Sequence, residues 1–324
     1  ENLVMNTDVL NTNLIEVMKN KIPDGVNLAN TLMDILYIGK EAVYRRLRGE
    51  VPFTLNEASI ISKKMGVSLD QIVGISYTNN AMFDLNLLHY SDPIKTYYTI
   101  LDHYLEVFEA LHDDPTSELS TASNMIPQTF YLQYENLSKF RLFKWMYQNE
   151  KVNCVKYFSE LTISDELKQV QKDFVKATQY IQTTNYIWDC MMFHYLVNDI
   201  KYFASIHLIT DEEVTNLQAY LLQLLDDLEA IASKGKFDTG KDVHIYISNI
   251  NFEATYSYVE TSNLQLSLIR IFSINSITSR DKDMCKSMKE WVQSLRKFST
   301  MISESGEMQR IQFFKKQREI VENM

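Results

Sequence analysis

The sequence predicts a mainly α protein with three parts: an N-terminal bundle of five short helices, a long helical middle domain, and a C-terminal region. In that last region we expect a small three-stranded antiparallel sheet plus two helices. Only 8 Gly and 5 Pro occur in 324 residues, so few backbone breaks interrupt helices. Apolar residues recur at helical spacing through most of the chain before Gly240. After Gly240, β-branched and aromatic residues alternate with polar ones, as in strands.

The composition is that of an ordinary globular protein, with 45% hydrophobic and 23% charged residues. No stretch of about 18 apolar residues occurs, and residues 1–10 lack the basic and apolar regions of a signal peptide. The cysteines are three and far apart, which favours reduced thiols over a disulfide framework: Cys154, Cys190 and Cys285. We therefore expect a cytoplasmic protein without a membrane span.

The first 74 residues predict five short helices packed into one compact bundle. Asn27 can cap the second helix, and Gly49 can end the third. Thr54-Leu-Asn-Glu57 and Ser68-Leu-Asp-Gln71 form capping boxes that open the fourth and fifth helices. The expected ranges are about 8–22, 27–36, 40–47, 54–65 and 68–73.

Two blocks in this segment resemble the lambda-repressor/Cro-like (XRE-type) helix-turn-helix family: Leu32–Gly49, and Met65-Gly-Val-Ser-Leu-Asp-Gln-Ile72. The likeness covers roughly residues 26–74. It implies a repressor-like bundle that binds double-stranded DNA, with the helix at 40–47 in the major groove. This sequence departs from the family pattern at Tyr37, where Gly is usual, and at Arg46, where an apolar residue is usual.

Carried over position by position, the resemblance implies that Lys40, Glu41, Tyr44 and Arg45 contact the bases. Arg and Lys can donate to guanine O6 and N7, and Glu can accept from cytosine N4. Phosphates are the expected partners of two further arginines, Arg46 and Arg48. The whole chain has a net charge of −10, and residues 1–74 carry 8 basic and 9 acidic side chains. Within residues 40–48, however, four cations face only one carboxylate, that of Glu41, so this helix has a local positive charge.

Residues 75–93 are expected to form a linker, and residues 94–240 a helical domain for sensing or dimerisation. The expected helices of that domain are 94–112, 129–149, 152–161, 165–204 with a break in its middle, and 211–233. In the α+β region at 241–324, we expect strands at 243–250, 253–261 and 264–274, followed by helices at 282–303 and 307–322. The second and third strands should form a hairpin, and the two helices should pack on the sheet. This region resembles the equivalent part of uncharacterised bacterial regulators.

Motifs of catalysis are missing from the sequence. None of the six histidines has zinc-site spacing, and no GxSxG, Walker or GxGxxG motif occurs. Dense aromatic residues between 130 and 195 are expected to form core rather than a pocket. The sequence thus predicts no enzyme activity, no metal and no cofactor.

Three hypotheses about function follow. The first is a bacterial, sequence-specific transcription regulator that binds double-stranded DNA as a homodimer and responds to an unknown small-molecule or peptide effector. The second is an interaction scaffold whose N-terminal bundle binds a protein partner. The third, supported least, is an enzyme with a site in the helical domain.

Overall fold

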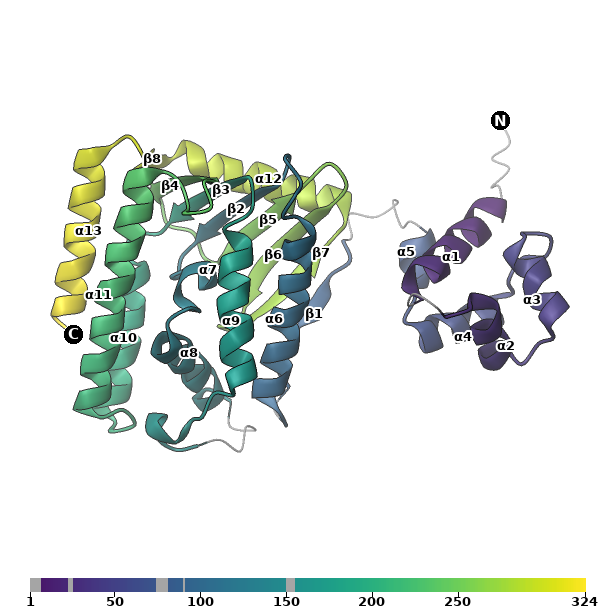
Figure 1. Cartoon of the computed structure of the whole chain (residues 1–324), viewed down its shortest axis with the longest axis horizontal. Helices are drawn as coiled ribbons and strands as arrows, with labels where there is room; N and C mark the ends of the chain where they lie inside the picture. Colours follow the sequence, from purple (N-terminus) through teal and green to yellow (C-terminus); the bar gives the residue numbers. More distant parts are fainter. Residues whose placement is uncertain (1–6, 23–25, 74–80, 90, 150–154) are drawn as a thin grey trace. The chain divides into compact units, whose positions relative to one another are not determined.

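The computed structural model describes residues 7–22, 26–73, 81–89, 91–149 and 155–324. The chain divides into two compact units, Glu1–Met82 and Phe83–Met324 (Figure 1). Each unit has its own hydrophobic core, so each is described by itself.

The N-terminal unit contains five helices around a small apolar core. Its largest fully buried side chains are Met18, Leu32 and Ile61, and Val43 is also fully buried. The helices are α1 (Thr7–Lys21), α2 (Leu28–Leu36), α3 (Lys40–Leu47), α4 (Leu55–Met65) and α5 (Leu69–Val73).

Two of the expected helix caps are present. The Asn27 side chain accepts from the backbone N–H groups of Ala29 and Asn30. Thr54 and Glu57 form a complete capping box at the start of α4. The box expected at Ser68 includes the Gln71 side chain, which lies outside the described part.

The turn between α2 and α3 contains a strained residue. Tyr37 ends α2 in the left-handed conformation, with φ 54° and ψ 41°, and its N–H donates to the Met33 carbonyl. A residue with a Cβ pays roughly 1–2 kcal/mol for this conformation. The Tyr37 side chain is 92% exposed, so no packing in the unit compensates for the strain.

Tyr37→Gly is therefore expected to stabilise the N-terminal unit by about 0.5–1 kcal/mol, the relieved strain less the backbone entropy of Gly. Amide hydrogen exchange of α2 and α3 in the full chain measures it. Gly66→Ala is the matched control, because Gly66 also has positive φ and an added Cβ would meet only Lys21 Nζ at 3.5 Å. Gly66→Ala should speed amide exchange in α4. Faster amide exchange of α2 in Tyr37→Gly would show that Tyr37 is not strained.

The second unit is built on an eight-stranded mixed sheet, in the order β1-β7-β6-β5-β2-β3-β4-β8. The central strands β2, β3 and β4 are parallel, because helices connect each to the next. The other pairs are antiparallel. The strands are β1 (Asp84–Asn86), β2 (Glu118–Ser123), β3 (Thr183–Trp188), β4 (Asp242–Ser248), β5 (Tyr256–Glu260), β6 (Gln265–Ile271), β7 (Asn275–Ser279) and β8 (Ser299–Met301).

Helices cover both faces of this sheet (Figure 1). On one face, α12 packs Met288, Val292 and Leu295 against Ala122 and Ile187. The larger core lies on the other face, under the remaining helices. The helices of this unit are α6 (Pro93–Ala110), α7 (Gln128–Tyr131), α8 (Glu135–Tyr147), η1 (Phe158–Glu160), α9 (Asp165–Thr178), α10 (Met192–Ser205), α11 (Asp211–Lys234), α12 (Lys282–Lys297) and α13 (Glu307–Glu322).

The predicted fold class is wrong in its sheet: a small three-stranded antiparallel sheet was expected, and eight strands of mixed direction are present. The sequence Glu-Leu-Ser-Thr-Ala-Ser of β2 is rich in hydroxyls and lies between the helices expected at 94–112 and 129–149, where no strand was predicted. Strand β3 divides the helix expected at 165–204 into α9 and α10. Both strands are largely buried by helices on the two faces, so they lack the alternation that marks a half-exposed strand.

The expected β-hairpin is confirmed, since β5 and β6 pair antiparallel around Thr261. Strand β4, however, lies between β3 and β8, apart from that hairpin. Of the helix expected at 152–161, residues 152–154 lie outside the described part, and the rest contains only the short η1. Cys190 and Cys285 are free thiols. The third cysteine, Cys154, lies outside the described residues.

Candidate nucleic-acid interface

Helix α3 has one face in the core of the N-terminal unit and another in solvent. Val43 is fully buried, and Tyr44 and Leu47 pack partly against the same core. Lys40, Glu41 and Arg45 are exposed. The four residues that the resemblance assigns to base contact thus lie on one short helix, three of them exposed and Tyr44 half-buried.

Two of these side chains are arranged one turn apart. The Lys40 Nζ atom lies over the Tyr44 ring, 5.9 Å from its centroid. At this distance the ring face attracts the ammonium group weakly. The pair therefore combines a cation, a flat ring and a phenol hydroxyl at the start of α3.

Arg46 is held inside the unit rather than free in solvent. Its guanidinium pairs with the Glu57 carboxylate at 2.8 Å, and both side chains are mostly buried, 16% and 14% exposed. A further N–H of Arg46 donates to the Ala42 carbonyl. The arginine thus links α3 to α4.

The pKa of Glu57 reflects its place between Arg46 and the start of α4. Burial is the largest influence on its pKa and raises it. Hydrogen bonds from Thr54 and Arg46, with the Arg46 charge, outweigh burial and hold the pKa of Glu57 below its ordinary value. Glu57 thus joins the capping box of α4 to the ion pair with α3.

A second set of ion pairs lies on the surface. Glu50 pairs with Arg48 at 2.6 Å and with Arg45 at 3.5 Å, and Glu41 pairs with Arg48 at 3.3 Å. The hydrogen bond from Arg48 is the main reason that the pKa of Glu50 is lowered. Glu50 lies two residues beyond Arg48 and adds a second carboxylate, beside Glu41, close to the cations of this helix. Its carboxylate competes for the two arginines that phosphates or bases would need.

Two large apolar side chains on this unit are almost fully exposed. Tyr37, in the turn before α3, is 92% exposed, and Leu55, at the start of α4, is 81% exposed. Neither was assigned a role from the sequence. Exposed apolar groups mark a contact site where they form one patch.

The described residues show neither a metal site nor a membrane span. No three His, Cys, Asp or Glu side chains among them come together to hold an ion. None of the described helices is long and apolar enough to cross a bilayer.

Comparisons with known proteins leave the family open. No family model matches the chain, and no curated protein matches it. Among solved structures it is similar to TrmBL2, an archaeal chromatin protein described as showing a novel mode of DNA binding. The identity is 8%, the match covers 90% of this chain and 99% of that one, and the TM-score is 0.25. A TM-score this low carries no argument about the present chain, so α3 is judged on its own geometry.

Proposed function

We propose that the protein is a sequence-specific, DNA-binding transcription regulator whose α3 enters the major groove. The observation that carries this proposal is the solvent face of α3, where Lys40, Glu41 and Arg45 project from a helix anchored by Val43. An exposed helix braced by a small bundle fits the width of the major groove. Lys40 and Arg45 donate to guanine, Glu41 accepts from cytosine, and Tyr44 lies beside them.

Arg48 is proposed as the phosphate contact, because it is exposed and its present partners are exposed carboxylates. Arg46 is left out of this role, since its guanidinium already pairs with Glu57 between α3 and α4. We further propose that the α/β unit provides dimerisation or sensing, because one bundle of this size buries little surface on DNA.

Selection from a random-sequence duplex library, with the full chain as bait, tests the function. The expected result is enrichment of one motif, with an affinity that falls steeply as salt concentration rises. Fluorescence anisotropy on the enriched duplex then gives the affinity. If no motif is enriched and no salt-dependent binding appears, the DNA-binding proposal fails.

Glu50→Gln is expected to tighten binding to the selected duplex by roughly threefold to tenfold, because it removes a carboxylate that repels phosphate and occupies two arginines. Anisotropy titrations at two salt concentrations measure the change. Glu16→Gln makes the same change of net charge at an exposed residue of α1. Equal effects of the two substitutions would show that Glu50 has no special place at the interface.

A protein partner for the N-terminal unit is the second candidate, favoured by the exposure of Tyr37 and Leu55. Tyr37→Ser combined with Leu55→Ser should abolish capture of a stoichiometric partner and leave DNA binding intact. Loss of motif-specific DNA binding in this variant would instead place these side chains at the DNA.

A further inference from the structure

The α/β unit has a small, partly open cavity between its sheet and two helices. Strands β2, β5 and β6 form the floor, and Phe108 of α6 and Phe174 of α9 cover it, with Gln128 and Thr129 at one end. Its volume is about 70 Å³, several times what one water molecule needs. It is about half of a cavity of roughly 150 Å³ that is known to accept benzene. Because the cavity is partly open, only the alkyl group of a ligand, about half the size of benzene, has to fit inside this volume.

The floor of this cavity changes from apolar to polar along the strands. Leu119, Val259 and Leu266 are paired neighbours across the three strands and form the apolar end. Two residues further along, Thr121 and Ser257 face the cavity, and their hydroxyls hydrogen-bond at 3.0 Å. Side chains on one face of a strand repeat every two residues, so Arg270 of β6 follows on the same face.

Arg270 has unused donors at this polar end. One of its N–H groups donates to the Ile274 carbonyl at 2.8 Å. Within the described residues, no carboxylate lies within ion-pair distance of its guanidinium, which carries five N–H donors. Arg270 and Gln128 are half-buried, as is Leu266, whereas Leu119 and Val259 are buried. A partly desolvated guanidinium without a carboxylate favours an anionic ligand.

A second cation, Arg141, acts on the same buried tyrosine as Arg270. Arg141 of α8 is buried, its Nε atom has no partner among the described residues, and it stacks on Tyr131. Burial holds the pKa of Tyr97 well above its usual value, while the charges of Arg270 and Arg141 both act in the opposite direction. Both guanidinium groups are thus close enough to influence one buried hydroxyl of α6.

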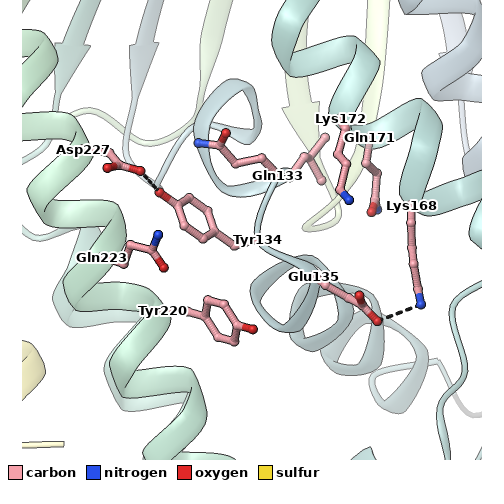
Figure 2. Close-up of a pocket in the computed structure, with 10 residues that line it drawn as sticks. Gln133, Tyr134, Glu135, Lys168, Gln171, Lys172, Tyr220, Gln223 and Asp227 are labelled. Carbon is pink, nitrogen blue, oxygen red and sulfur yellow. Dashed lines mark hydrogen bonds and ion pairs between the residues drawn. The ribbon is translucent and has the colours of Figure 1, made fainter.

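A wider hollow of about 330 Å³ lies between α8, α9 and α11, and it is a weaker candidate for a ligand site (Figure 2). Asp227 accepts a hydrogen bond from Tyr134, and Glu135 pairs with Lys168 at 2.9 Å. Both of its carboxylates have partners, but Lys172 also lines it and forms no ion pair within the described residues. The cavity beside Arg270 is smaller and more apolar, so it limits the shape of a ligand more closely.

We propose that this cavity binds a short-chain monocarboxylate of about three to four carbons, whose alkyl group fits the volume. Its carboxylate accepts from Arg270 and from the hydroxyl of Ser257, which itself accepts from Thr121. Its alkyl group lies among Leu119, Phe174 and Leu266. Uptake of the acid involves the α/β unit alone and is independent of DNA binding by α3.

Isothermal titration of the full chain with isobutyrate tests the site. The neutral isostere isobutyramide has the same shape but no charge, and phenylacetate is too large for the volume. We expect binding of isobutyrate, no measurable binding of the other two, and binding weakened by about tenfold to hundredfold in Arg270→Gln. Arg280→Gln, at an exposed arginine after β7 that does not line the cavity, should bind as the unmodified chain does.

Several outcomes would overturn the proposal: no heat with isobutyrate, equal binding of the amide, or unchanged affinity in Arg270→Gln. Circular dichroism checks that the variant folds. If it does not, the comparison of isobutyrate with isobutyramide on the unmodified chain decides, because it needs no substitution.

Discussion

Arg45→Ala is expected to weaken binding to the selected duplex by roughly fivefold to more than a hundredfold. A bidentate contact of arginine with guanine discriminates by about 1–3 kcal/mol. Arg45 is exposed on α3 and held only by a long ion pair with Glu50, 3.5 Å, so it is free to exchange that partner for a base. Anisotropy titrations of the full chain measure the loss.

The control separates a base contact from a general loss of charge. Arg280→Ala removes one exposed arginine from the α/β unit and should leave the affinity nearly unchanged. Arg45→Lys keeps the charge but lacks the planar fork, so it should keep the salt dependence and lose discrimination at one base pair. If Arg45→Ala and Arg280→Ala bind equally well, Arg45 does not face the bases.

Arg46→Ala is expected to destabilise the N-terminal unit by about 2 kcal/mol. The pair with Glu57 is mostly buried, so removing the arginine leaves a desolvated carboxylate without its cation. The value lies below that for fully buried pairs because both side chains keep some contact with water. Hydrogen exchange of α3 and α4 amides in the full chain measures it, since these helices meet at the pair.

Arg48→Ala is the matched control for stability, because its ion pairs are exposed and its loss should change protection little. A double-mutant cycle with Glu57→Gln isolates the pair, since glutamine can still accept from the Thr54 N–H. A cycle in which the two substitutions are additive would show that the ion pair adds nothing to stability.

The ion pair between Arg46 and Glu57 also makes the stability of the N-terminal unit depend on pH. The pKa of Glu57 is depressed in the folded protein, so its contribution is fully present above its ordinary value near 4.5. That contribution is lost as the pH falls through the folded value. Protection of α4 should therefore decline below about pH 4.5 in the unmodified chain, and decline less in Arg46→Ala. An identical decline in both would mean that other carboxylates cause it.

The N-terminal helices were predictable because their signals are local. Asn27 and Thr54 cap their helices through neighbouring N–H groups, and apolar spacing within each helix marks the buried face. The role of Arg46 was not predictable, because its partner Glu57 lies eleven residues away on another helix. A sequence pattern shows which face a residue occupies, but tertiary packing decides which opposite charge it meets.

Most strands of the sheet could not be predicted either, because they too depend on partners far away in the sequence. Residues of β2 such as Ser120 and Ser123 favour turns in isolation, and only the neighbouring strands make them extended. Strand β1 pairs with β7, almost two hundred residues later, so no local signal could place it. The cavity beside Arg270 depends on the same long-range pairing and was equally beyond reach.

The two outermost strands of the sheet have a consequence for self-association. Both β1 and β8 are three residues long, so the flanks of an otherwise broad sheet offer few unpaired backbone groups to a second chain. Edge-to-edge joining of two copies into a continuous ribbon, the first step toward fibrils, is thereby disfavoured. If two copies of this protein pair, we expect side chains on the helical surfaces to hold them together instead.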